Sequence, residues 1–258
     1  MKKALRVLVT NDDGIDTPGL NLLAKTAQQL SPDAEIWIVA PLVEQSGASQ
    51  SLTMANPVRI HPMGERRYAV SGTPADCVII ALQQIMKDFP PDVVLSGVNA
   101  GVNIGFDVNL SGTLGGAFTS LMYGVPSIAI SMKRGEHKDV RWETAQAILP
   151  SLLSDLLEQG WDKGHCLSVN IPNLPLEKIV GARWTHPSHG ITPPFATKPG
   201  KDLRDREYFW IYPSHHPKTD AAPESDAAAL QQGFVSISVL ALTRGFVMPK
   251  SAPPKIKE

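Results

Sequence analysis

The stretch "LRVLVTNDDGID" (residues 5–16) runs from apolar residues directly into two adjacent carboxylates, Asp12 and Asp13. Leu5, Val7, Leu8 and Val9 have the branched apolar side chains that are typical of a buried β-strand. Two neighbouring negative charges repel each other, so their position at the end of such a strand needs a physical reason. A bound cation would remove the repulsion. The alternative is a simple turn in which an acid caps the next helix, because Asp-Gly is a common turn signal.

Strands and helices alternate on both sides of this stretch. Residues 34–40 form a second strand-like run, and apolar residues recur at helical spacing in the segment 18–30 between the two strands. The same alternation continues with a helix at 74–86, a strand at 92–97, a helix at 115–124 and a strand at 126–131. This order predicts an α/β fold: a doubly wound, mostly parallel, Rossmann-like sheet with helices on both faces.

The second half of the chain has a different texture. An amphipathic helix is expected at 141–160, with a kink or a break at Pro150. Strands are expected at 166–172 and 180–186, and a helix and a strand at 226–242. Residues 186–226 are rich in Pro, His and Lys and show weak periodicity, so we expect an irregular arm there. The predicted division is a catalytic core at 1–165, a C-terminal β-rich extension used in oligomerisation at 166–248, and a disordered tail at 249–258.

Composition narrows the class of protein. The 258 residues carry a formal net charge of −1, which gives no basic field for a nucleic-acid polymer or an acidic membrane surface. No run approaches the roughly 20 apolar residues of a membrane span, and the first residues lack the features of a signal peptide. The two cysteines, Cys77 and Cys166, lie in apolar segments and favour buried free thiols. We therefore expect a soluble, cytoplasmic protein.

Oxygen-bearing side chains follow several of the predicted strands. Ser46 comes after the second strand, and Asn99 and Asn103 come after the strand at 92–97. Ligands of open α/β sheets collect at the carboxyl ends of the strands, where these residues would meet the two acids. Carboxylate, hydroxyl and amide oxygens suit Mg²⁺, Mn²⁺ or Ca²⁺. The sequence thus predicts a divalent-cation site at Asp12 and Asp13, which Ser46 and Asn99 could complete.

A second candidate feature is "SGTLGG" (residues 111–116), a turn of small residues before a predicted helix. Exposed backbone N–H groups and the helix dipole favour a phosphate there, with the hydroxyls of Ser111 and Thr113 as further donors. An ordinary helix N-cap explains the same residues. The chain lacks the glycine fingerprint of dinucleotide binding, the Walker motif and the GxSxG elbow, and its histidines lack zinc-site spacing.

Several ordered motifs together resemble the SurE family, the stationary-phase survival proteins. The resemblance spans nearly the whole chain, and it rests on "VTNDDGIDTPGL" (9–20), "VAPLVEQSGASQSLT" (39–53), "VSGTPADCV" (70–78), "PDVVLSGVNAGVNIG" (91–105), "SGT" (111–113), "LSVNIPNLP" (167–175) and "SDAAALQQGFVSISVL" (225–240). It implies a divalent-metal-dependent phosphatase that hydrolyses nucleoside monophosphates to nucleoside and phosphate. The implied substrates are 5′-nucleotides, with 3′-nucleotides as further candidates. It also implies a homodimer or homotetramer formed by exchange of part of the C-terminal region.

The resemblance assigns roles to individual residues. It implies one Mg²⁺ or Mn²⁺ per subunit, held by the catalytic residues Asp12 and Asp13 together with Ser46 and Asn99. The implied phosphate contacts are Asn103, Ser111, Gly112 and Thr113.

Two positions depart from the family pattern: Leu110 replaces the usual Tyr, and Thr119 stands where a Glu is common. These departures affect the expected substrate preference more than the expected reaction. A non-catalytic nucleotide or metal sensor on the same fold is the alternative function. A nicotinamide oxidoreductase is disfavoured because the glycine fingerprint is missing. The attacking group is a water molecule or an aspartate, and we favour water because both carboxylates are most simply explained as cation ligands.

Overall fold

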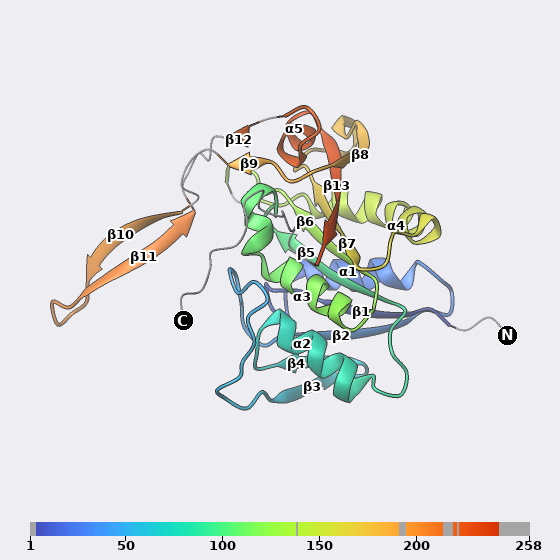
Figure 1. Ribbon diagram of the computed structural model, residues 1–258, viewed down its shortest axis with the longest axis horizontal. Coiled ribbons are helices and arrows are strands. Elements are labelled where there is room, and N and C mark those ends of the chain that lie inside the picture. Colours follow the sequence, from blue (N-terminus) through green and yellow to red (C-terminus); the bar gives the residue numbers. More distant parts are fainter. Residues whose placement is uncertain (1–3, 138, 191–194, 214–218, 221, 243–258) are drawn as a thin grey trace, which may run out of the picture.

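A computed structural model of the protein describes residues 4–137, 139–190, 195–213, 219–220 and 222–242. One nine-stranded sheet forms its centre, in the order β3-β4-β2-β1-β5-β6-β7-β13-β8 (Figure 1). Its strands are β1 (Arg6–Thr10), β2 (Glu35–Pro41), β3 (Ile60–Gly64), β4 (Arg67–Val70), β5 (Val93–Ala100), β6 (Ser127–Met132), β7 (His165–Ile171), β8 (Gly181–Thr185) and β13 (Phe234–Ala241).

The middle of the sheet is parallel. β1 pairs in parallel with β2 and β5, and β6 continues the parallel run from β5 to β7. Antiparallel pairing occurs between β3 and β4 and between β7 and β13. The predicted mostly parallel α/β sheet is therefore confirmed. Strands from beyond residue 165 extend this same sheet, so the C-terminal region is built directly onto the core.

Helices cover both faces of the sheet, as the doubly wound prediction required. α1 (Pro18–Gln28) and α4 (Trp142–Gln159) lie on one face, whereas α2 (Pro74–Ile80) and α3 (Gly112–Met122) lie on the other (Figure 1). A π-helical turn, η1 (Ala81–Ile85), continues α2. Three shorter elements are η2 (Gly105–Asn109), η3 (Leu176–Lys178) and α5 (Asp226–Gln231).

The central strand β1 shows how the two faces are filled. Val7 and Val9 are fully buried in the cluster that contains the apolar side of α1 and α4, and Leu8 is fully buried in the cluster under α2. Successive side chains of a strand point to opposite faces, so a continuous apolar run is what a strand covered on both faces needs. The free thiols of Cys77 and Cys166 are buried, as predicted.

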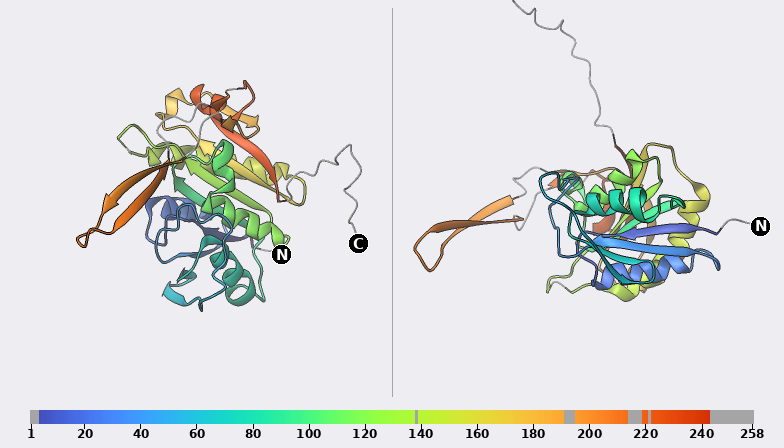
Figure 2. Two further views of the ribbon diagram at one scale, coloured as in Figure 1. Left: turned by 60° about the vertical axis from the view of Figure 1, so that its left-hand side comes forward. Right: turned by 90° about the horizontal axis from the view of Figure 1, so that it is seen from below.

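Two expectations for the second half are wrong. The segment 186–226 was expected to be irregular, but it contains the antiparallel hairpin of β10 (Phe195–Lys201) and β11 (Glu207–Pro213), which projects from the body of the molecule (Figure 2). Both faces of this ribbon are exposed along most of its length, so its sequence has no apolar and polar alternation to reveal the strands. Two short strands, β9 (His189–Gly190) and β12 (Thr219–Asp220), also pair in this segment.

The second expectation was a kink or a break at Pro150, and the break is wrong because α4 runs through this residue without interruption, whereas the kink stays a prediction. Proline removes one backbone hydrogen bond, while the buried apolar side chains of α4 before and after it anchor the whole helix to the sheet. The expected tail at 249–258 lies outside the described residues. Within the described part of the chain, no helix is both long enough and apolar enough to cross a bilayer.

We predict that Leu153→Ala lowers the free energy of unfolding by about 2–5 kcal/mol, because it leaves a cavity in the fully buried face of α4. The neighbouring exposed residue gives the control, Ser154→Ala, which should change stability by less than about 0.5 kcal/mol. Urea denaturation of both variants measures the difference. Equal midpoints for the two variants would show that α4 does not pack as described.

Candidate active site

The carboxyl ends of the parallel strands bring the predicted site residues to one edge of the sheet. Asp12 is buried and Asp13 half-buried, directly after β1. The hydroxyl of Thr113, in the first turn of α3, donates a hydrogen bond of 2.7 Å to Asp12 Oδ1. The backbone N–H of Ala100, at the end of β5, donates to Asp13 Oδ2 at 3.2 Å. Two neighbouring elements thus hold the two carboxylates separately.

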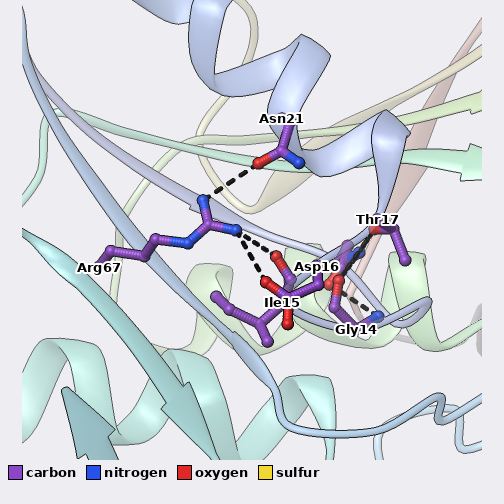
Figure 3. A network of polar contacts seen from close by, with 7 residues as sticks. Gly14, Ile15, Asp16, Thr17, Asn21 and Arg67 are labelled. Carbon is purple, nitrogen blue, oxygen red and sulfur yellow. Dashed lines mark hydrogen bonds and ion pairs between the residues drawn. The ribbon is translucent and has the colours of Figure 1, made fainter. Parts of the chain in front are cut away.

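The loop that carries the acids is fixed from both sides. Asn11 Nδ2 donates to the carbonyl of Gly14 and to the hydroxyl of Thr17, each at 2.9 Å. The guanidinium of Arg67, from β4, reaches across to donate to Asn21 Oδ1 and to the carbonyl of Ile15 (Figure 3). The acids therefore sit in a tightly bonded turn, which explains why the "NDDG" turn signal and a cation site can both be correct.

Gly112 allows α3 to approach the acids closely. A Cβ atom added at this position would lie 2.8 Å from Asp12 Cβ and 3.0 Å from Asp12 Oδ2. Real Cβ atoms do not make contacts this short, so any larger residue would push the helix away from the carboxylate. The predicted phosphate residue Gly112 is thus in direct contact with the predicted metal residue Asp12.

Asn103 lies behind Thr113 in a buried polar chain. Its Nδ2 donates to Ser131 Oγ at 2.8 Å and to Thr113 Oγ1 at 3.3 Å. The backbone of Asn103 exchanges two hydrogen bonds with the side-chain amide of Asn170, at the end of β7. Four predicted residues, Asp12, Gly112, Thr113 and Asn103, therefore form one contiguous set.

The two neutral residues predicted to complete the cation site make no hydrogen bond to the acids through their side chains within the described part of the chain. Ser46 is in the loop after β2, where the N–H of its neighbour Gln45 donates to the carbonyl of Asp12 at 2.8 Å. The Ser46 hydroxyl donates to Glu44 Oε1 at 2.7 Å. Asn99 Nδ2 donates to the carbonyl of Gly101 at 2.8 Å, which engages its nitrogen and leaves its oxygen for another partner.

A bulge in β5 sets the direction of Asn99. The pairing of β5 with β6 shifts register between Ser96 and Asn99. Gly97 within this bulge has φ = 139°, a backbone conformation that only glycine adopts easily. Bulges of this kind redirect a side chain at the end of a strand and are common next to functional sites.

Ser111 has the role of an ordinary N-cap. Its hydroxyl accepts a hydrogen bond of 3.1 Å from Leu114 N–H at the start of α3. The positive end of the helix dipole still faces the site, because the first turn of α3 is in contact with Asp12. Capping and anion binding are therefore compatible at this helix, and the two interpretations of "SGTLGG" do not exclude each other.

Burial dominates the electrostatics of the pair. Burial, together with the weaker effect of repulsion by Asp13, raises the pKa of Asp12 from 3.8 to about 6, against the hydrogen bond from Thr113. Burial also raises the pKa of Asp13; the Ala100 N–H and the positive charge of Arg134 oppose this rise, and Glu44 adds to it. In the metal-free protein these carboxylates therefore resist ionisation, which a bound cation would reverse.

The donor set fits a hard divalent cation. Asp12 and Asp13 supply two carboxylates, and the amide oxygen of Asn99 is left over because only its nitrogen is engaged, by the carbonyl of Gly101. Within the described ranges, no group of three or more His, Cys, Asp or Glu side chains gathers to hold a metal. A site here would thus use two carboxylates and neutral oxygens, a composition that suits Mg²⁺ or Mn²⁺ better than zinc.

Sequence reasoning missed four residues that shape this site. Ser131 and Asn170 are the second-to-last residues of β6 and β7, so the rule that strand ends carry ligands could have found both. Arg134 and Glu44 influence Asp13 through their charges, and no sequence signal distinguished them from other exposed charged residues.

Comparison with known proteins identifies the family of the chain. The family model described as "Survival protein SurE" matches residues 7–192. The chain belongs to the SurE family. Among curated SurE proteins, "5′-nucleotidase SurE 1" of Burkholderia lata is 45% identical over 239 residues, 93% of this chain and 91% of that protein. "5′-nucleotidase SurE" of Caulobacter vibrioides is 42% identical, over 92% of this chain and 90% of that one.

A solved SurE structure has the same fold. The crystal structure of the SurE protein from Aquifex aeolicus matches with a TM-score of 0.78 and 32% identity, covering 92% of this chain and 94% of that one. The predicted SurE resemblance is therefore confirmed, while the roles of the individual site residues stay predictions.

We predict that Asp12→Asn stabilises the metal-free SurE chain at pH 7.5, by on the order of 2–3 kcal/mol. The pKa of Asp12 is higher in the folded protein, at about 6, than the ordinary 3.8 of an unfolded chain. Its contribution to stability is therefore full below about pH 4 and is lost as the pH rises through about 6. Thermal unfolding in chelator, at pH 4 to 8, measures the effect.

The control is Asp33→Asn, which removes an exposed carboxylate in the turn before β2, at the amino end of that strand. It should leave the pH dependence unchanged. A metal-free wild type as stable at pH 7.5 as Asp12→Asn would contradict the burial of an ionised carboxylate at this position.

Proposed function

We propose that this protein is a divalent-metal-dependent phosphomonoesterase that hydrolyses nucleoside 5′-monophosphates to nucleoside and phosphate. The observation that carries the proposal is the contact of Asp12 with Thr113 and Gly112, which joins the candidate cation site to the start of α3. The printed names of the Burkholderia and Caulobacter relatives, both 5′-nucleotidases, support the same activity. Hydrolysis of 3′-nucleotides is a further part of the proposal.

The proposed substrate contacts follow from the geometry. The dianionic phosphate would lie against the N-terminal turn of α3. The amide of Asn103 would be a neighbouring donor, which requires its Nδ2 to give up the longer of its two hydrogen bonds, the 3.3 Å bond to Thr113 Oγ1. Thr113 would keep Asp12 oriented through its 2.7 Å hydrogen bond. Stabilisation of charge on the equatorial oxygens is usually the main catalytic contribution in phosphoryl transfer, so rigid donors at this position are what the reaction needs.

A Mg²⁺ or Mn²⁺ ion held by Asp12, Asp13, Ser46 and Asn99 would supply Lewis-acid chemistry, neutralising phosphate charge. For Ser46 this requires its hydroxyl to turn from Glu44 toward the acids. We propose one such ion per subunit. Both carboxylates are then engaged, which favours water over Asp12 as the attacking group. Mass spectrometry of the enzyme trapped during turnover tests this point, because a phosphoaspartate on Asp12 or Asp13 would overturn it.

The deciding experiment is a hydrolysis assay over nucleoside 5′- and 3′-monophosphates with Mg²⁺, with Mn²⁺ and with a chelator. We expect release of phosphate that requires the metal, and a loss of at least about 100-fold in Asp12→Asn and in Asp13→Asn. Asp33→Asn is the control and should keep wild-type turnover.

The same assay separates the proposal from the alternative of a sensor. Binding of nucleotide and metal by calorimetry without any turnover would show that the chain is a sensor on this fold. Turnover that survives the chelator, or that survives in Asp13→Asn at saturating metal, would overturn the assigned cation site.

We also propose that the protein is a homodimer or homotetramer in which the arm, residues 186–226, contributes to the interface. On β11, Phe209, Trp210 and Ile211 have exposed fractions of 61%, 66% and 73%. Consecutive large apolar side chains on a projecting hairpin are costly to leave in water and are typical interface anchors (Figure 2).

Replacing the hairpin 195–213 by a short Gly-Ser linker should lower the number of subunits per particle measured by light scattering, because it removes these exposed apolar residues. The control, Leu203→Ser, changes a fully exposed side chain between the two strands and should leave the mass unchanged. A wild-type monomer at micromolar concentration would contradict the proposal.

A further inference from the structure

A buried carboxylate outside the candidate cation site connects two distant parts of the chain. Asp226, the first residue of α5, is 2% exposed. Its Oδ2 accepts the N–H of Gly105 at 2.8 Å, and its Oδ1 accepts the N–H of Ser188 at 2.9 Å. Oδ1 also accepts the N–H of Ala227 at 2.7 Å. Three backbone N–H groups from three places in the chain converge on this one side chain, which makes a firm junction.

The first segment that Asp226 holds leads into the phosphate-binding residues. Gly105 begins η2, and the carbonyl of Asp107 within η2 accepts the N–H groups of Leu110 at 3.0 Å and of Ser111 at 2.9 Å. Two residues before Gly105, Asn103 is held by Asn170. The loop of residues 103–113 is therefore fixed at its start by Asn170 and Asp226, and at its end by α3.

The second segment that Asp226 holds is the base of the arm. The backbone of His186 accepts the N–H of Asp226 at 3.0 Å and donates to the carbonyl of Glu224 at 3.2 Å. Gly105 and Ser188 also pack closely: a Cβ atom added at Gly105 would lie 2.8 Å from both the carbonyl oxygen and the hydroxyl of Ser188. The base of the arm and the loop of residues 103–113 are thus in rigid contact with each other.

Helix capping alone does not explain Asp226. The preceding residue, Ser225, already caps α5, because its hydroxyl accepts the N–H of Ala228 at 3.2 Å. The Asp226 carboxylate caps its own helix only through Ala227, and its other two bonds go to segments that are 121 and 38 residues away in sequence. A side chain that served only to cap α5 would not need hydrogen bonds to Gly105 and Ser188.

We propose that Asp226 is a positioning residue for phosphoryl transfer, which fixes the loop 103–113 and couples it to the base of the arm. The inference rests on the proposed phosphatase function. A misplacement of about 1 Å in a group that binds the reacting phosphate can cost roughly 100-fold in rate. If the arm shifts in the assembly, the Asp226 carboxylate would transmit this shift to the loop 103–113. The position of the arm and the rate of turnover are then linked.

The first test is Asp226→Asn, which keeps the size of the side chain but weakens its hydrogen bonds to the three N–H groups. With a nucleoside 5′-monophosphate and Mn²⁺, we expect kcat/KM to fall by about 10- to 100-fold. The affinity for Mn²⁺ alone should stay within about twofold, because Asp12 and Asp13 are untouched. Hydrogen exchange should become faster in peptides covering 103–111 and 186–188.

Leu153→Ala is the control for a general loss of stability, since it weakens the packing of α4 away from the loop. It should keep kcat/KM at temperatures where it is folded, and its exchange at 103–111 should stay at the wild-type rate. If Leu153→Ala lowers kcat/KM as much as Asp226→Asn at equal loss of stability, or if Asp226→Asn keeps wild-type kinetics, the inference is wrong.

A second measurement needs no variant, in case Asp226→Asn fails to fold. In the wild-type protein, Mn²⁺ with inorganic phosphate should slow exchange at 103–113 and also at the junction peptides 186–188 and 225–227. Protection of the loop without any at the junction would overturn the coupling. A wild type that binds both ions yet hydrolyses no nucleotide would instead count against the proposed function, and this exchange experiment would still test Asp226.

Discussion

The rest of this structure depends on the cost of removing two neighbouring carboxylates from water. Asp12 is buried at the end of β1 and Asp13 is half-buried beside it, and burial raises the pKa of both carboxyl groups. A fold accepts this cost only where other groups compensate for it. The compensation comes from the Thr113 hydroxyl, the Ala100 N–H and the charge of Arg134, each from a different strand end or helix start.

The parallel sheet makes this compensation possible. Its strands β1, β5, β6 and β7 end at the same edge, so residues 12, 100, 131 and 170 become neighbours although they span most of the chain. Gly112 then lets the positive end of α3 reach the carboxylate directly. The site is therefore a property of the sheet edge as a whole, and the C-terminal residues Asn170 and Asp226 support it as much as the N-terminal motif does.

The hairpin of the arm and the base of the arm are held in different ways. Its hairpin is held mainly by its own cross-strand pairing and exposes aromatic side chains, whereas its base is bonded to the body through buried groups. This division places a surface suited to assembly next to a loop suited to chemistry. Such an arrangement explains why the segment that looked least structured in the sequence lies so close to the residues that the sequence marked as functional.

The sequence by itself determined the fold class and the order of the main elements, and it picked out Asp12, Gly112, Thr113 and Asn103 as candidate site residues. These features depend on local patterns: apolar runs, helical spacing, and polar residues directly after strands. Only the tertiary structure decided that β10 and β11 form a ribbon, that α4 continues through Pro150, and that Ser131, Asn170 and Asp226 support the site. These features depend on contacts between residues far apart in the chain, and such contacts leave no periodic or local signal in a single sequence.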